Sequence, residues 1–376
     1  MAVAGVSDGG RRRVSAALPD FPWDTIAGAR ATAAAHPGGL VDLSVGTPVD
    51  PVDPLIRRAL DAAAQFPGYP TTIGTPELRG AAAAALARRY GTVELGGDQI
   101  LPVIGTKEAI AGICTTLGLG AGSTVVIPEV AYPTYEVSAI LAGAHSVRAD
   151  STGIAAGSDA ALVFLNSPSN PTGAVMGVDE LRAVVAWARE RGAIVVSDEC
   201  YLGLAWEAEP VSVLDPRVCD GDVSGLIAVH SLSKISNLAS YRAGFFAGDA
   251  ELIAELLAVR KHSGLMVPFP IQAAMTAALG DDRHVDEQAD KYRARREVLK
   301  PAVIEAGLRV DHSEAGLYLW ATRDEDARVT HHWLAERGIL AAPGDFYGPA
   351  GATHVRIALT ATDEQIAEAA ERLSLG

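Results

Sequence analysis

Short apolar runs alternate with longer amphipathic segments through the first two thirds of the chain. The runs lie at residues 40–45, 100–104, 124–127, 160–165, 193–196 and 226–229. The segment at 179–191 has helical spacing, with Leu181, Val184 and Ala188 on one face and Gly192 as its end. Strands that are apolar throughout are typical of a parallel sheet covered by helices on both faces. We therefore predict an α/β fold with a large, mostly parallel sheet.

The pattern changes after Gly248. Helical spacing covers 251–263, 271–279 and 285–305, strand-like pieces follow at 309–312, 316–321, 339–342 and 354–359, and a helix at 363–373 closes the chain. This part reads as a smaller α+β domain. We predict a disordered tail at 1–13, a segment at 14–45 that joins the small domain, a large domain at 46–262 and the small domain at 263–376.

Composition narrows the class of protein. The chain has 376 residues, 49% of them hydrophobic, which suggests roughly two domains. A net charge of -15 argues against a nucleic-acid surface. The three cysteines, Cys114, Cys200 and Cys219, have no paired metal-ligand spacing, so we expect no metal site and a reducing cytoplasm. The N-terminus lacks a signal-peptide pattern, and the alanine-rich run at 81–87 is too short to cross a membrane.

A lysine, two hydroxyls and an arginine gather after one strand. The run at 226–229 leads into Ser231 and Ser233, then Lys234, and Arg242 follows eight residues later. Hydroxyls and a guanidinium suit a phosphate. A desolvated lysine amine suits covalent chemistry on a carbonyl carbon. Pyridoxal 5'-phosphate (PLP) carries both groups, although this stretch alone is equally compatible with an ordinary surface loop.

Polar residues also follow the other predicted strands. Gly105, Tyr132, Asn170, Asp198 and Lys234 all fall at or just past strand ends. Because ligands bind at the carboxyl ends of parallel strands, we expect these residues to meet at one edge. Taken singly, each has an ordinary role as a cap, a turn residue or a core tyrosine.

The chemistry of PLP gives these residues separate roles. Its ring acts as an electron sink when the ring nitrogen is protonated, and Asp198 could hold that proton in place. Tyr201 and Asn170 could bond the phenolic oxygen of the cofactor. Tyr132 could stack on the ring.

Ten short motifs occur in the order found in one enzyme family. They are LSVGTP, YPTTIGTPELR, GTKEA, YPTY, NPTG, DECY, SLSK, EAGLYLW, PGDFYG and HVRIAL. From about residue 20 onward the chain resembles the fold type I, class I/II aminotransferases. Ser240 departs from the glycine of many relatives, which leaves only the local loop geometry in doubt.

The resemblance implies a role for each matching residue. Lys234 would bond covalently to the cofactor and move the proton between substrate and cofactor. Asp198 would pair with the ring nitrogen, Asn170 and Tyr201 with the phenolic oxygen, and Tyr132 with the ring face. The phosphate would be held by Ser231, Ser233, Arg242 and the backbone of Gly105 and Thr106, and Lys107 would also belong to the cofactor-binding residues.

The substrate side and the quaternary structure follow from the same resemblance. Arg356 would clamp the substrate α-carboxylate, aided by Gly46 and Asn170. Tyr69 would reach the phosphate in the partner subunit, which implies a homodimer.

Longer stretches, among them DLSVGTPVDPVD and APGDFYGPAGATHVRIALTATDE, resemble the succinyldiaminopimelate aminotransferase branch of the family. That branch exchanges an amino group between glutamate and N-succinyl-2-amino-6-oxopimelate. Both substrates carry a distal anion, and Lys107 is our hypothesis for the second cation, although an exposed lysine at a helix start is comparably compatible with the sequence. Aspartate, prephenate or aromatic aminotransferase activity, or a lyase or synthase of this fold, remain alternatives. A DNA-binding regulator is disfavoured by the short N-terminal tail and the acidic charge.

Overall fold

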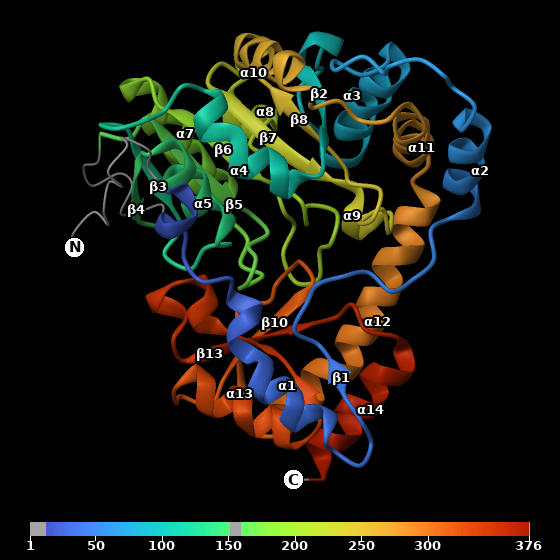
Figure 1. The fold of residues 1–376 in the computed structure, drawn as a ribbon, viewed down its shortest axis with the longest axis vertical. Helices are drawn as coiled ribbons and strands as arrows, with labels where there is room; N and C mark the ends of the chain where they lie inside the picture. Colours follow the sequence, from blue (N-terminus) through green and yellow to red (C-terminus); the bar gives the residue numbers. More distant parts are fainter. Residues whose placement is uncertain (1–12, 151–158, 376) are drawn as a thin grey trace.

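The computed structural model describes residues 13–150 and 159–375. The predicted tail at 1–13 lies outside the described residues, apart from Arg13. A large sheet with its helices forms one lobe and a smaller sheet forms the other, and the long helix α12 (Arg283–Glu305) runs between them (Figure 1). The domain boundaries given above remain a proposal.

The large sheet has seven strands in the order β2-β8-β7-β6-β5-β3-β4. β8 runs antiparallel to both of its neighbours, and the other pairings are parallel. The predicted mostly parallel sheet is therefore confirmed. The strands are β2 (Ile100–Ile104), β3 (Thr124–Ile127), β4 (His145–Arg148), β5 (Leu162–Asn166), β6 (Ile194–Asp198), β7 (Leu226–Ser231) and β8 (Ala243–Gly248).

Alternate residues of the buried strands, β4 excepted, enter different hydrophobic cores on the two faces of this sheet. In β7, Ile227 and Val229 pack with α4 (Thr106–Thr116), α5 (Thr134–Ala142) and α10 (Ala250–Ser263). Leu226 and Ala228 belong to the core of the opposite face. That core also holds residues of α2 (Pro54–Ala63), α3 (Pro76–Tyr90), α7 (Val178–Arg191), α8 (Pro216–Cys219) and α11 (Phe269–Leu279). The period of two along each strand explains why apolar runs occur without alternation.

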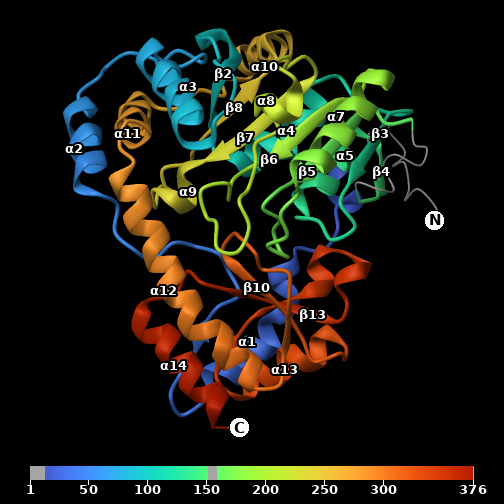
Figure 2. The ribbon, with the colours of Figure 1, turned by 180° about the vertical axis from the view of Figure 1, so that it is seen from behind.

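The smaller lobe contains an antiparallel sheet in the order β12-β13-β10-β9 and a separate parallel pair, β1 with β11. Figure 2 shows α12 and α14 covering this lobe from behind. The strands are β1 (Val41–Asp42), β9 (Arg309–Asp311), β10 (Tyr318–Thr322), β11 (Ile339–Leu340), β12 (Ala342–Pro343) and β13 (His354–Ala358). The helices are α1 (Ala27–Ala34), α12, α13 (Ala327–Glu336) and α14 (Asp363–Ser374).

Several expected elements differ in the structure. The predicted strand at 40–45 is reduced to β1, because the Asp42 carboxylate accepts bonds from the backbone N–H and the hydroxyl of Ser44 and turns the chain. The run at 339–342 is split between β11 and β12, which belong to different sheets. β4 and α13 were not predicted from the sequence. β4 is only half-buried, and the buried face of α13 includes the polar residues Thr330 and His331, so neither has a strong apolar run.

Short helical turns complete the fold. They are η1 (Val14–Ala17), η2 (Pro22–Ile26), η3 (Gly97–Gln99), α9 (Leu232–Ile235), η4 (Gly344–Tyr347) and η5 (Pro349–Gly351). No helix in the part of the chain described here is long and apolar enough to span a membrane.

Candidate active site

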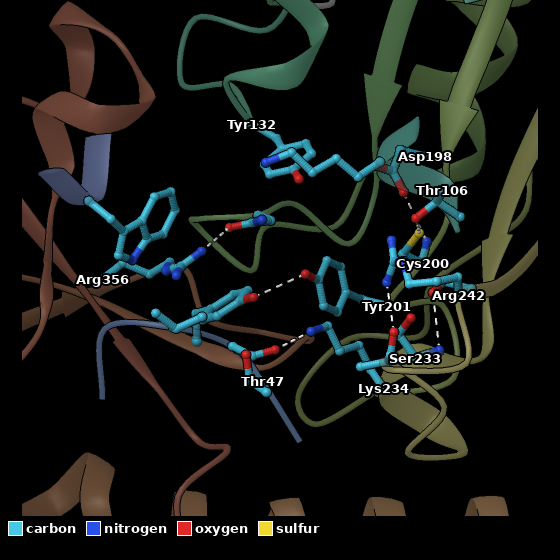
Figure 3. A pocket seen from close by; sticks show the side chains of 18 of the residues that line it. Thr47, Thr106, Tyr132, Asp198, Cys200, Tyr201, Ser233, Lys234, Arg242 and Arg356 are labelled. Carbon is cyan, nitrogen blue, oxygen red and sulfur yellow. Dashed lines mark hydrogen bonds between the residues drawn. The ribbon is translucent and has the colours of Figure 1, made fainter. Parts of the chain in front are cut away.

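One cavity of about 430 Å³ lies at the carboxyl ends of the large-sheet strands and is closed by the small lobe. Figure 3 shows side chains from both lobes pointing into it. Among the predicted residues, its lining includes Gly46, Thr106, Lys107, Tyr132, Asn170, Asp198, Tyr201, Ser231, Ser233, Lys234, Arg242 and Arg356. The lining also includes residues that sequence reasoning missed, which are Phe21, Trp23, Val45, Thr47, Cys200, Ala239 and Tyr318.

Two predicted residues do not line the cavity. Gly105 immediately precedes Thr106 and contacts the lining through Arg242. Tyr69 is 94% exposed and does not contribute to the cavity of its own chain.

Lys234 lies on α9, directly after β7. The chain turns here because the Ser231 hydroxyl accepts a bond from the Ser233 N–H and caps the short helix. The Lys234 ammonium donates to the carbonyl oxygen of Gly46, in the segment after β1. Burial lowers the pKa of Lys234, and the nearby Arg356 and Arg242 lower it further against an opposing effect of Tyr318. A lysine held in this way is more readily deprotonated, as a nucleophile requires.

Asp198 ends β6 and is 5% exposed. Its carboxylate accepts from the Tyr135 hydroxyl at 2.8 Å and from the Cys200 N–H at 3.2 Å. Burial raises the pKa of Asp198, against the lowering effect of these two donors. No lysine or arginine forms an ion pair with Asp198 within the described ranges. A buried carboxylate without a cation is suited to a protonated ring nitrogen.

Asn166 ties two of the functional loops together. It lies opposite Asp198 in the β5–β6 ladder, and its side chain donates to the Asp198 carbonyl at 2.9 Å. The same side chain accepts from the Asn170 N–H at 2.7 Å. Sequence reasoning missed this residue, although it lies four residues before Asn170 of the NPTG motif and ends a buried strand.

Arg242 and Gly105 form a close contact next to the serine hydroxyls. Gly105 has φ of +77°, and a Cβ at this position would lie 2.2 Å from a guanidinium nitrogen of Arg242. The helix α4 begins directly after it, so backbone N–H groups and the positive end of the helix dipole face the same region. With Ser231, Ser233 and Thr106, these groups are an appropriate donor set for a phosphate.

Arg356 lies on β13 and is 3% exposed. Its guanidinium donates to Asn170 Oδ1 at 2.8 Å and to the Ser44 carbonyl at 2.6 Å. It lies 4.0 Å from the ring centre of Tyr318 and 5.2 Å from that of Tyr347. Its Nε has no hydrogen-bond partner in the described residues. A fixed, partly unsatisfied guanidinium at the cavity wall is suited to bind a carboxylate.

Tyr318 was not identified as a site residue, although it lies within the EAGLYLW motif. Its hydroxyl is 3.1 Å from the hydroxyl of Tyr201, and its ring supports the Arg356 guanidinium. Gly46 is required beside it, because a Cβ there would lie 2.1 Å from the Tyr318 hydroxyl. Its position depends on the β10–β13 pairing, which the sequence alone does not reveal.

The mouth of the cavity is aromatic and carries one lysine. The Lys107 ammonium lies 5.6 Å from the ring centre of Phe21 and 5.9 Å from that of Tyr132. Burial lowers the pKa of Lys107, and Arg242 adds to this effect. Trp23 packs against Phe346 with ring centres 5.5 Å apart. Lys107 has no ion-pair partner in the part of the chain described here.

These groups match PLP part by part: a lysine for its aldehyde, a phosphate-binding set, a buried carboxylate for its ring nitrogen and a tyrosine hydroxyl near them. The fold and site thus define an enzyme of the PLP-dependent class.

Comparison with known proteins gives the family. Residues 39–373 match the family described as aminotransferase class I and II. A probable aminotransferase of Mycobacterium tuberculosis is 64% identical, with 97% of this chain and 87% of the relative covered. The 4-dedimethylamino-4-oxo-anhydrotetracycline transaminase of Streptomyces rimosus is 56% identical, with 95% and 99% covered.

A solved structure of similar fold is also an aminotransferase. The N-succinyldiaminopimelate aminotransferase of Mycobacterium tuberculosis has a TM-score of 0.84 and 29% identity, and 93% of this chain and 96% of that chain are covered. The chain belongs to the class I and II aminotransferases, which use pyridoxal phosphate.

Proposed function

We propose that this aminotransferase moves an amino group between glutamate and N-succinyl-2-amino-6-oxopimelate, giving 2-oxoglutarate and N-succinyl-LL-2,6-diaminopimelate. The observation that carries this proposal is that two cations line the cavity besides Lys234 and Arg242, which we assign to the cofactor. Arg356 is buried at its wall, and Lys107 lies at its mouth among aromatic rings. A substrate with a carboxylate at each end would meet a cation at each end.

The substrate α-carboxylate would bind at Arg356, where the guanidinium is held by Asn170 and Ser44. Lys107 would then bind the distal carboxylate, and the rings of Phe21 and Tyr132 would flank the chain between them. The N-succinyldiaminopimelate enzyme among the structural neighbours and several LL-diaminopimelate aminotransferases at about 30–32% identity support this substrate class.

The remaining residues would handle the cofactor and the proton. PLP, when bound, supplies an electron sink for the charge that develops at the substrate α-carbon. Asp198 would keep a proton on the ring nitrogen, and the Arg242 region would hold the phosphate. Lys234, with its lowered pKa, would take the proton from the substrate α-carbon and would then donate it to the cofactor.

A homodimer completes the proposal. Tyr69 is 94% exposed, and Val49 and Phe66 on the same stretch of chain are 48% and 44% exposed. Exposed aromatic and aliphatic side chains of this kind are frequent at subunit interfaces. Tyr69 would contribute to the phosphate site of the partner. We place the enzyme in the cytoplasm, and the free thiols Cys114, Cys200 and Cys219 support that proposal.

A second candidate is transfer to a polycyclic ketone. It is favoured by the 56% identity to the Streptomyces rimosus transaminase, compared with 29% for the succinyldiaminopimelate enzyme of known structure. Phe21 and Trp23 at the cavity mouth could pack against fused rings.

The half-reaction separates these candidates. Purified enzyme would be mixed with single amino donors, and the conversion of PLP to pyridoxamine phosphate would be followed by absorbance. Glutamate and N-succinyl-LL-2,6-diaminopimelate should both convert the cofactor. The panel should include aspartate, aromatic amino acids and an amino-anhydrotetracycline. Conversion by one of these donors without conversion by the succinylated donor would contradict the proposed substrate and leave the enzyme class intact. Release of ammonia and pyruvate without a keto acid would indicate a lyase.

A further inference from the structure

Tyr318 connects two parts of the site that are otherwise separate. Its hydroxyl lies 3.1 Å from the hydroxyl of Tyr201, and both side chains are buried. Its ring face lies 4.0 Å from the Arg356 guanidinium carbon. Tyr318 therefore contacts the proposed cofactor-binding tyrosine at one end and the proposed carboxylate clamp on its face.

The direction of the Tyr201–Tyr318 bond has a functional consequence. Each hydroxyl has one hydrogen to donate. If Tyr201 donated to Tyr318, its hydrogen would be unavailable to the phenolic oxygen of the cofactor. If Tyr318 donates, the Tyr201 hydrogen is free for that oxygen, and the two bonds polarise each other in the same direction.

The environment of Tyr318 favours the donor role. A cation over an aromatic face attracts electron density from the ring, which makes the hydroxyl a better donor. The Gly46 backbone fits tightly against the Tyr318 hydroxyl. Tyr201 is thus the hydrogen-bond partner that the described residues provide for the Tyr318 hydroxyl.

We propose that Tyr318 is a positioning residue that donates to Tyr201 and transmits carboxylate binding at Arg356 to the phenolic oxygen of the cofactor. A substrate carboxylate neutralises the cation over the Tyr318 ring, so Tyr318 donates less strongly. With the cofactor bound, Tyr201 would then polarise its phenolic oxygen less, and that oxygen would better stabilise a proton at Lys234 Nζ. This inference rests on the cofactor class and holds whichever amino donor the enzyme uses.

The test measures a spectrum rather than turnover. In the loaded enzyme, the visible absorbance of the lysine-bound cofactor reports protonation of that nitrogen, and a pH titration gives its midpoint. Among charged and titratable groups, Tyr318, Arg356, Cys200 and Arg242 act most strongly on Lys234, and the Tyr292 hydroxyl donates to its backbone carbonyl. The variant changes only Tyr318. Tyr318→Phe keeps the ring under Arg356 and removes the donor. The midpoint should rise by about 0.5–1 pH unit, the equivalent of one hydrogen bond.

Tyr347→Phe is the matched control. Tyr347 also lies over Arg356, at 5.2 Å, but its hydroxyl has no hydrogen-bond partner in the described residues. Its replacement should leave the midpoint unchanged. An equal rise in both variants would mean that any lost hydroxyl near Arg356 has this effect, and would overturn the proposal.

A second measurement tests whether Tyr318 transmits the effect of carboxylate binding at Arg356 to the cofactor. Glutarate offers carboxylates without an amino group, so it can bind but cannot react. It should raise the midpoint in the unmodified enzyme and raise it by less than half as much in Tyr318→Phe. Equal shifts in the two proteins would show that the carboxylate acts by another route, such as Asn170, which also bonds Arg356. An unchanged midpoint in Tyr318→Phe without glutarate would refute the donor role itself.

Discussion

The Tyr135 hydroxyl donates to the Asp198 carboxylate at 2.8 Å, across the β6 end of the large sheet. Tyr135 lies on α5, is fully buried and stacks on Phe164 with ring centres 4.8 Å apart. The bond counteracts the effect of burial, which raises the pKa of Asp198. Tyr135 therefore helps to keep the carboxylate ionised where it would meet a cofactor nitrogen.

Tyr135→Phe should weaken cofactor binding. Loss of a hydrogen bond to a charged group costs roughly 1.5–3 kcal/mol, so we expect about a 10-fold or greater rise in the dissociation constant of PLP. The loss should grow as the pH falls, because the pKa of Asp198 would rise further. Equilibrium dialysis at several pH values gives the affinity, and urea unfolding of the cofactor-free protein provides the control. Unchanged affinity with reduced stability would assign Tyr135 to packing alone.

Lys234→Ala should abolish the covalent bond to the cofactor and most of the turnover. We expect a loss on the order of 10²–10⁴-fold, because the variant removes the residue that we propose as both nucleophile and proton carrier. The visible band of the lysine-bound cofactor should disappear, while circular dichroism and size-exclusion chromatography remain as in the unmodified protein. A Lys234→Ala enzyme that transaminates at the rate of the unmodified enzyme would refute the proposed chemistry.

Gly105→Ala should displace Arg242. The new methyl group would lie 2.2 Å from a guanidinium nitrogen, and φ at this position is +77°. Gly91→Ala is the control, since Gly91 has φ of +62° but nothing within 4 Å. Gly91 is in the left-handed helical conformation, with ψ of 26°, so its variant should lose about 1–2 kcal/mol of stability. Gly105 has ψ of 144°, a conformation that is almost exclusive to glycine, so its variant should lose about 1–3 kcal/mol. Only Gly105→Ala should also weaken PLP binding, by about 10-fold, in a fluorescence titration. Equal PLP affinity in the two variants would contradict a role for the Gly105–Arg242 contact.

Lys107→Met tests the distal-carboxylate site. The KM for glutamate should rise by about 10-fold, because a charged hydrogen bond is lost, whereas the KM for norvaline, which has the same carbon chain without the distal carboxylate, should not change. Lys261→Met removes the same charge from the exposed end of α10, outside the cavity lining, and should leave both values unchanged. If the KM for glutamate stays constant in Lys107→Met, Lys107 is only a solvent-exposed lysine at a helix start.

His331 should make the stability of the fold depend on pH. It is 3% exposed on α13, and burial lowers its pKa from 6.5 to about 4. Between these values the unfolded chain binds a proton that the folded chain does not, so stability is full above pH 6.5 and falls as the pH drops towards 4. The loss should approach about 3 kcal/mol. Urea unfolding from pH 7 to 4 should show a flatter profile for His331→Gln, with the exposed neighbour His332→Gln as control. If the free energy of unfolding of His331→Gln depends on pH as steeply as that of the unmodified protein, His331 is not the source of the pH dependence.

The large sheet illustrates which strands can be predicted from the sequence alone. Its apolar runs predicted β2, β3, β5, β6 and β7, because strands buried on both faces need apolar residues throughout. The half-buried β4 lacks such a run and was missed. The small lobe was harder to predict, since its short strands depend on partners far along the chain, as β1 with β11 does.

In the candidate site, too, some features could be predicted from the sequence and others only from the tertiary structure. By itself, the sequence determined which chemical groups stand at the strand ends, because a parallel sheet puts all its carboxyl ends at one edge. That was enough to bring Lys234, Asp198 and Asn170 into one cavity. Only the tertiary structure decided that Tyr135, Tyr318 and Asn166 support them. Each of these contacts joins segments that are far apart in the sequence and meet only after the sheets and lobes have packed. A local sequence pattern does not show which distant residues will come into contact.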